Sequence, residues 1–233
     1  MEEKFKYKDT ILKVKSDLDL VNEVEQVLIT AYQELGEYIT SNPNFRSSLE
    51  HLELDENAPK IVRDMLEAGE LFNVGPMATV AGKFSEIIVD ECIKKGANWA
   101  IVENGGDICL YGDKKFLISM HAGKSPLSDK FGLDINPGKR KYGICTSSSS
   151  VGHSISLGDS DAVTVLGPSS AITDAAATAV ANEVKGDVDE NAIDRGIEFS
   201  KKFIKQGCID GVLIMKGENI GKIGKIPRIV ELK

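Results

Sequence analysis

Residues 102–112 read VENGGDICLYG. Two β-forming runs meet at Asn104-Gly105-Gly106, where glycine adopts the positive φ angles of a tight two-residue turn at little cost. The stretch therefore predicts a β-hairpin, and a hairpin implies neighbouring strands that run antiparallel. Glu103 and Asp107 border the turn, and its glycines leave room for a ligand close to the backbone.

Helices are predicted mostly before this hairpin, and strands mostly after it. Patterns typical of helices cover residues 20–39, 44–52, 58–72, 77–95, 169–186 and 190–207. Patterns typical of strands cover 5–14, 98–103, 107–112, 114–122, 141–147, 161–167, 209–216 and a terminal strand pair within 220–233. Ser170 is the predicted N-cap of the helix over 169–186. This order favours an α+β fold in one domain over 1–233, with a largely antiparallel sheet packed against helices.

The composition excludes several classes of protein. The chain has 233 residues, 42% of them hydrophobic, and a net charge of −8. An acidic chain without a long basic block is unsuited to nucleic acid or to an anionic membrane surface. No apolar run approaches the roughly 18 residues of a membrane span, and the opening MEEKFKYKDT has no apolar signal region. We therefore expect a cytoplasmic protein that binds a small molecule, with homo-oligomer formation left open.

A run of hydroxyls occupies residues 145–154, which read CTSSSSVGHS. Such a run is either a flexible linker or the wall of a site that offers hydroxyl and backbone donors to an anion. Cys145 is the candidate reactive thiol of a chain whose cysteines form no CxxC pair, and a buried inert thiol is the alternative. His153 is a candidate acid–base group, with a structural histidine as the alternative.

Residues 172–182 read ITDAAATAVAN. Asp174 and Thr178 lie four residues apart, so they share one face of a helix. A carboxylate and a hydroxyl are hard oxygen ligands of the kind that Mg²⁺ prefers. The alternative is an aspartate that satisfies a helix N-terminus within an alanine-rich buried helix.

Residues 75–84 read GPMATVAGKF. Gly75-Pro76 breaks the chain, and small residues then open a helix. The N-terminus of such a helix is suited to an anion. The alternative is close packing of this helix against its neighbours.

Taken together, these stretches resemble the ApbE-like superfamily, a T-fold-related group whose best-known members are FAD:protein FMN transferases. That family shows, in order, a small-residue helix start, an N-x-G-G-D-type turn, a T-S-rich segment and a D-A-x-x-T helix. Here these motifs occupy residues 76–83, 103–107, 146–150 and 174–178. The motifs GPMA, VENGGDI and CTSS with VGHS are similar to those of a cytosolic prokaryotic branch. The transferases' His…Asp-Pro-x-Thr-Gly segment has no counterpart after His153.

The resemblance implies a metal site and a ligand site. Mg²⁺ would be bound by Asp174, Thr178 and a backbone carbonyl of Ala78 or Thr79. FAD or another nucleotide-like ligand would contact the turn and the hydroxyl run, which together comprise Glu103, Asn104, Gly105, Gly106, Asp107, Thr146, Ser147, Ser148 and Ser149.

Three functions follow as hypotheses. The first is a Mg²⁺-dependent enzyme that transfers a group from a phosphorylated or nucleotide-like small molecule, with His153 as the acid–base group. The second is a sulfur-handling protein that uses Cys145 as a thiolate, which requires a thiol pKa well below the usual ~8.5. The third is a non-catalytic binding protein that kept the fold, because fold alone does not fix function.

Overall fold

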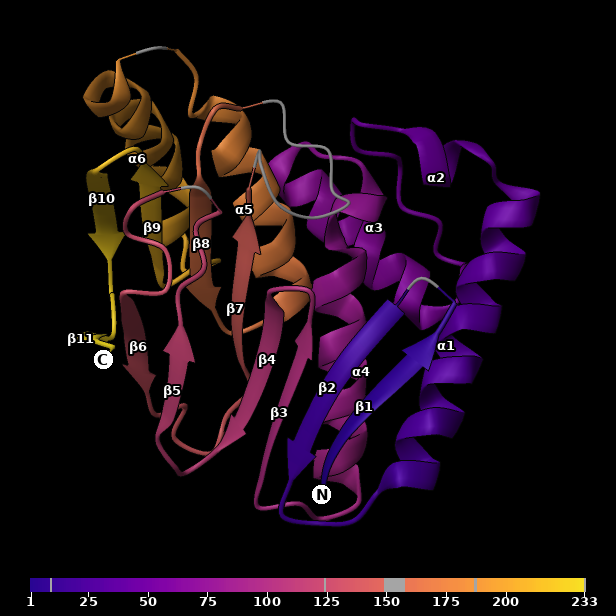
Figure 1. Ribbon diagram of the computed structural model, residues 1–233. Helices are drawn as coiled ribbons and strands as arrows, with labels where there is room; N and C mark the ends of the chain where they lie inside the picture. Colours follow the sequence, from indigo (N-terminus) through magenta and orange to yellow (C-terminus); the bar gives the residue numbers. More distant parts are fainter. Residues whose placement is uncertain (9, 124, 149–157, 187, 233) are drawn as a thin grey trace.

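An eight-stranded antiparallel sheet forms the centre of the molecule (Figure 1). The structure is a computed structural model that describes residues 1–8, 10–123, 125–148, 158–186 and 188–232. Each neighbouring pair in the sheet is antiparallel, as the hairpin at residues 102–112 predicts. In spatial order the strands are β1 (Glu2–Tyr7), β2 (Thr10–Ser16), β3 (Trp99–Asn104), β4 (Asp107–Gly112), β7 (Tyr142–Ser147), β8 (Ala162–Gly167), β9 (Gly211–Lys216) and β10 (Asn219–Gly224).

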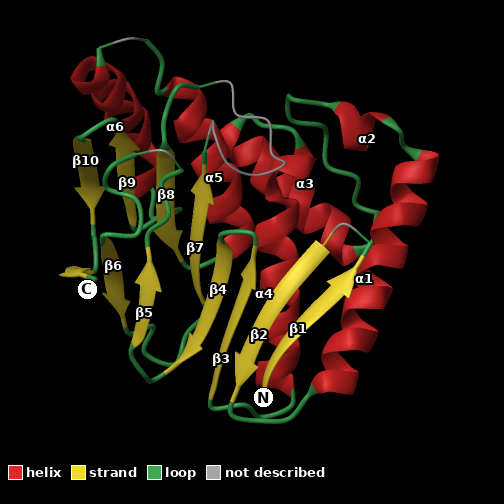
Figure 2. Ribbon diagram, in the orientation of Figure 1, coloured by secondary structure: helices red, strands yellow, loops and turns green. Residues whose placement is uncertain are grey.

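Helices cover one face of this sheet, as Figure 2 shows. They are α1 (Val21–Ser41), α2 (Asn44–Ser47), α3 (Lys60–Phe72), the 3₁₀ turn η1 (Pro76–Thr79), α4 (Val80–Lys94), α5 (Ser170–Glu183) and α6 (Asp189–Lys205). Side chains from α1, α3 and α4 pack on β2, β3 and β4, and those from α5 and α6 pack on β7, β8 and β9. The α+β architecture predicted from the order of the elements is therefore confirmed.

A second, three-stranded sheet covers part of the other face. Its order is β11 (Arg228–Glu231), β6 (Phe131–Ile135) and β5 (Phe116–Ser119). Its apolar side chains form one buried cluster with residues of β4, β7, β8 and β9. The large sheet is thus packed on both faces over these four strands.

Strand alternation decides which side chains face the helices. In β3 and β4, Val102 and Cys109 pack with the helices, whereas Ile108 and Leu110 pack with the small sheet. In β7, Cys145 packs with α5 and Ile144 with the small sheet. Because side chains alternate with a period of two, the same rule decides on which face of the sheet each polar residue at the ends of these strands lies.

Several local predictions are wrong in ways that neighbouring residues explain. The helix expected over 44–52 ends after Ser47, because Ser48 is extended. The N-cap of α5 is Ser169 rather than Ser170, and its hydroxyl accepts a hydrogen bond from the Ile172 N–H at 3.4 Å. The two terminal strands do not pair with each other, since β10 joins β9 and β11 joins β6. Strand β6 was not predicted, because glycine and aspartate interrupt the β pattern of FGLDI.

Within the described residues, no helix combines the length and apolarity that crossing a membrane requires.

Substitution in the turn between β3 and β4 tests whether the hairpin depends on the positive φ angles of its glycines. Gly105 and Gly106 have φ angles of 64° and 115°, and a Cβ at either would meet no atom within 4 Å. We expect Gly105→Val to lower the free energy of unfolding by about 1–2 kcal/mol, through backbone strain alone. Urea denaturation measures this change. Gly105→Asn is the control and should cost much less, because asparagine tolerates positive φ; equal losses for both variants would contradict the explanation.

Candidate functional site

Asp174 lies in α5 and caps the start of α4. Its Oδ2 accepts a hydrogen bond from the Gly82 N–H at 2.8 Å, and the Ala81 N–H also donates to the carboxylate. These N–H groups belong to the first turn of α4, which has no carbonyl partners for them within the helix. The anion site predicted at the small-residue helix start is therefore occupied by a carboxylate of the chain itself.

Glu86 lies in α4 and caps the start of α5. Its Oε2 accepts hydrogen bonds from the Ser169 hydroxyl at 2.7 Å and from the Ser170 N–H at 2.8 Å. Each helix thus carries a carboxylate that caps the other. Although burial alone would raise it, the positive charges of Lys83 and Lys141 hold the pKa of Glu86 below its usual value.

Gly82 makes this exchange of caps geometrically feasible. A Cβ at Gly82 would lie 2.3 Å from the Ser170 carbonyl oxygen and 2.8 Å from the Asp174 Cβ. Gly143 of β7 has the same role on the other side of α5, where a Cβ would lie 2.6 Å from the Thr173 hydroxyl. The start of α5 is therefore held against backbone on two sides, which fixes the position of Asp174 one turn later.

Asp107 supplies a second carboxylate beside Asp174. It follows the Gly105-Gly106 turn on the helix-facing side of β4, and its Oδ1 accepts a hydrogen bond from the Thr146 N–H at 3.2 Å. The Ser85 hydroxyl of α4 donates to the Asp107 carbonyl at 2.8 Å. The hairpin tip is tied to α4 again through Asn104, whose Nδ2 donates to the Ala81 carbonyl at 3.3 Å.

The two aspartates disfavour each other's charged form. Burial raises the pKa of Asp107 to about 7. Burial, and then the charge of Asp107, raises the pKa of Asp174 well above its usual value. Asp174 is buried and Asp107 is half-buried, and two such neighbouring carboxylates are stabilised by a shared proton or by a bound metal ion.

Two hydroxyls extend this site along α5 and β7. Thr178 lies one turn after Asp174 on the same helix and is 6% exposed. Ser147 ends β7 on the helix-facing side; it is 5% exposed, and within the described chain its hydroxyl has no hydrogen-bond partner. Ala78 and Thr79 end the turn before α4, so they lie beside the N–H groups that Asp174 caps.

Two of the predicted ligand contacts lie on the opposite face of the sheet. The Glu103 side chain faces away from the helices and pairs with Lys13, with 2.9 Å between Oε1 and Nζ. The Thr146 hydroxyl is 2.8 Å from the Thr164 hydroxyl of β8, also on that face. The Thr146 backbone, by contrast, is part of the aspartate site through its N–H.

Cys145 is buried, contrary to the expectation of an accessible thiolate. Its Sγ donates to the Ser170 carbonyl at 3.3 Å and accepts from the Thr173 hydroxyl at 3.2 Å. Burial, followed by the charges of Asp107 and Asp174, raises the pKa of the Cys145 thiol well above its usual value. The sulfur-handling hypothesis requires the opposite direction.

The remaining predicted residues lie in or beside the hydroxyl run. Ser148 is buried at the end of β7. Ser149 and His153 lie outside the described residues. The described residues continue from Gly158, and the Asp159 N–H donates to the Val184 carbonyl at 2.7 Å, beside the end of α5.

A network of charged side chains around Glu86, at the start of α5, was not predicted from the sequence. Lys83 is 3% exposed; its Nζ lies 2.5 Å from Asp64 of α3 and 3.6 Å from Glu86. Lys141 lies 3.4 Å from Glu86 and 2.8 Å from Asp90. The sequence signal that could have predicted this network is a Lys and a Glu three residues apart on the apolar face of the helix that became α4.

No three His, Cys, Asp or Glu side chains of the described ranges lie close enough together to hold a metal ion by themselves. A cation bound at Asp174 and Asp107 would therefore need hydroxyl, carbonyl and ligand oxygens to complete its coordination.

Comparisons with known proteins agree with this fold. The family model described as "AbpE bacteria" matches residues 2–224. The UPF0280 protein of Methanococcus maripaludis strain C7 is 43% identical over 233 residues, which cover 99% of this chain and 93% of that protein. The UPF0280 protein of Methanocaldococcus jannaschii is 41% identical over 223 residues, which cover 95% and 88%.

Solved structures of low sequence identity share the fold. The apo form of the Pseudomonas stutzeri flavinyl transferase ApbE matches with a TM-score of 0.63 at 15% identity, over 96% of this chain and 94% of that one. The ApbE protein of Thermotoga maritima matches with a TM-score of 0.62 at 12% identity, over 95% and 96%.

Thiol labelling tests the burial of Cys145. We expect iodoacetamide at neutral pH to modify Cys208 first, because Cys208 is partly exposed whereas the other cysteines are buried. Burial raises the pKa of Cys92 to about 11 and that of Cys109 to about 12, and each unit lowers the thiolate fraction about tenfold. Peptide mapping over time gives the order, and early labelling of Cys145 would restore the reactive-thiol hypothesis.

The raised pKa of Asp107 predicts a pH-dependent stability. Unfolded, this carboxyl ionises near pH 4; folded, its pKa is about 7. Between these values the native state holds the extra proton, so stability falls as pH rises. We expect Asp107→Asn to stabilise the protein at pH 8 relative to pH 4, by on the order of 2 kcal/mol. Denaturation at both pH values, with the exposed Asp194→Asn as control, measures the effect; equal pH profiles for wild type and Asp107→Asn would contradict it.

Proposed function

This chain belongs to the family described as AbpE bacteria and has the fold of the ApbE flavin transferases, and from this premise we propose that it binds a flavin-like or nucleotide-like phosphorylated molecule with Mg²⁺ and transfers a group from it. The neighbouring carboxylates of half-buried Asp107 and buried Asp174 are the observation that carries this proposal. Their raised pKa values mark a place where positive charge is missing.

The residues around this pair suit a hard cation. Asp174 and Asp107 supply carboxylate oxygens, Thr178 supplies a hydroxyl, and Ala78 or Thr79 supplies a carbonyl beside the start of α4. The unpartnered Ser147 hydroxyl offers a further donor or acceptor to the ligand. A bound Mg²⁺ would supply charge for neutralising and orienting a phosphoryl group.

The chain's own groups would hold the rest of the ligand. The Gly105-Gly106 turn has no side chain that would keep a ligand from the backbone. Asp107 keeps the Thr146 N–H occupied, so phosphate binding would rely on the metal and on the hydroxyls of Ser147 and Ser148. We assign the acid–base role to His153 on the strength of the sequence.

The first alternative is a non-catalytic protein that binds the same ligand. It differs from the proposed enzyme only in the absence of turnover. The sulfur-handling alternative is disfavoured, because the Cys145 thiol is buried and its pKa is raised.

Titration calorimetry tests the metal and the ligand together. Mg²⁺ usually needs substrate phosphates to complete its shell, so we expect it to bind weakly alone and more tightly with FAD or ADP. The coupling should be about 1–3 kcal/mol and the same in either order of addition. Asp174→Asn should abolish the coupling while keeping the cap on α4, because asparagine also accepts a hydrogen bond.

Two controls make this result specific. Thr178→Val removes a proposed ligand without touching the cap, and Asp194→Asn changes an exposed carboxylate elsewhere. Identical Mg²⁺ affinity with and without every nucleotide, together with unaltered binding in Asp174→Asn, would leave Asp174 as a helix cap only. Mass spectrometry of small molecules released from freshly purified protein then identifies the natural ligand.

A further inference from the structure

The outer face of β1 and β2 is uncovered, whereas Trp99 and Ile101 of β3 pack against the cluster under the small sheet. The small sheet packs over β4, β7, β8 and β9, and it stops short of the first two strands (Figure 1). On this uncovered face Ile11 is 41% exposed. The face lies on the opposite side of the sheet from Asp174, so it is separate from the site described above.

Lysines dominate this face. Alternation places Lys4 and Lys6 of β1 beside Lys13 and Lys15 of β2, and we call these four residues the lysine face. Two of them are neutralised, since Lys13 pairs with Glu103 at 2.9 Å and Lys15 with Glu2 at 2.6 Å. Lys4 and Lys6 form no ion pair with any described residue. A concentration of positive charge in a chain of net charge −8 is a feature that attracts acidic partners.

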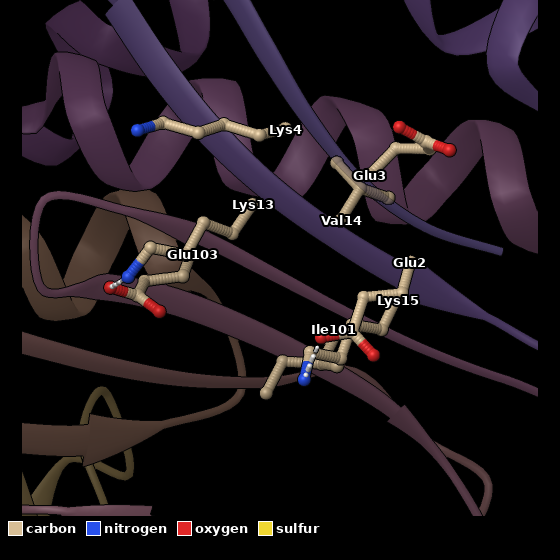
Figure 3. Close-up of a pocket in the computed structure, with 8 residues that line it drawn as sticks. All are labelled: Glu2, Glu3, Lys4, Lys13, Val14, Lys15, Ile101 and Glu103. Atoms are coloured by element: carbon tan, nitrogen blue, oxygen red, sulfur yellow. Dashed lines mark hydrogen bonds and ion pairs between the residues drawn. The ribbon is translucent and has the colours of Figure 1, made fainter.

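The arrangement includes a like-charge contact. Lys4 lies directly opposite Lys13 in the β1–β2 ladder, and like charges in that position destabilise a sheet. A hollow of about 380 Å³ opens beside them. Figure 3 shows the Lys4 amine pointing toward the same side as the head groups of the Lys13–Glu103 pair. The hollow is lined by Glu2, Glu3, Lys4, Lys13, Val14, Lys15, Ile101 and Glu103.

Strand β1 also offers hydrogen bonds. It is the outermost strand of the large sheet, and among the described strands it pairs with β2 alone. An edge strand presents a row of backbone N–H and C=O groups that a further strand can pair with.

We propose that β1 and the lysine face form a docking surface for an extended acidic segment of a partner protein, which adds to the edge of the sheet as a further strand. Lys4 and Lys6 are two residues apart on one face, or roughly 7 Å along the strand. An incoming strand with carboxylates at every second residue would place them opposite these two amines. The acidic side chains would also relieve the contact between Lys4 and Lys13.

Lysines on an edge strand have a simpler use, which is to prevent edge-to-edge aggregation. That use requires no binding of acidic strands, and any charge of either sign would serve it. The two explanations therefore differ in their response to charge reversal.

The test uses a short fluorescein-labelled peptide of alternating glutamate and threonine, with a lysine–threonine peptide as its counterpart. We expect the full-length protein to bind the glutamate peptide, and Lys4→Glu/Lys6→Glu to weaken that affinity by about tenfold or more, since cross-strand charge pairs change from attractive to repulsive. The same variant should bind the lysine peptide better than wild type does. Fluorescence anisotropy gives both affinities.

Lys222→Glu/Lys225→Glu is the matched control, because it reverses two exposed lysines at or just beyond the opposite edge strand, β10. It should leave the binding unchanged, as should Asp174→Asn, which keeps this test independent of the proposed function. Hydrogen exchange should also slow at the β1 amides when the glutamate peptide is present.

Several results would overturn the proposal. They are an absence of glutamate-peptide binding, equal loss in the control variant, unchanged exchange at β1, or binding of tripolyphosphate that displaces the peptide as well as unlabelled peptide does. The last result would mean that the face attracts anions in general and has no preference for an extended acidic chain.

Discussion

The exchange of carboxylate caps between α4 and α5 is the contact on which the rest of the site depends. Asp174 satisfies the first turn of α4, and Glu86 satisfies the first turn of α5. Gly82 brings the two backbones close enough for both contacts. Because α4 also holds the β3–β4 turn through Asn104 and Ser85, the position of Asp107 follows from the same exchange.

The two capping carboxylates differ in the charges that surround them. Glu86 has Lys83 and Lys141 within 3.6 Å and 3.4 Å, so its charge is compensated and its pKa is lowered. Asp174 has Asp107 beside it instead, and its pKa is raised. A buried group whose charge is left uncompensated costs stability unless something else binds there. The charge of one cap is therefore compensated by lysines of the chain, and the other cap is the place where we propose that a cation binds.

The sequence predicted the hairpin and most helices, because turn glycines and helical periodicity are local signals. It could not predict that Asp174 and Glu86 exchange caps, since that depends on the close approach of helices far apart in the chain. It also missed the face on which Glu103 and the Thr146 hydroxyl lie, which a one-residue change in strand phase would reverse. The burial of Cys145, which counts against the reactive-thiol hypothesis, could not be predicted because neighbouring residues in the sequence do not report burial.

The pairing of strands sets the order in which the chain can fold during synthesis. The first hairpin, β1–β2, must wait for β3, which follows four α-helices and a 3₁₀ turn. Strand β6 likewise has only β5 for a neighbour until residues 228–231 leave the ribosome. Contacts between such distant segments form slowly, because a long loop must close first. The nascent protein therefore carries an unfinished sheet edge for most of its translation, first at β2 and later at β6, and a chaperone that shields extended strands would find its substrate there.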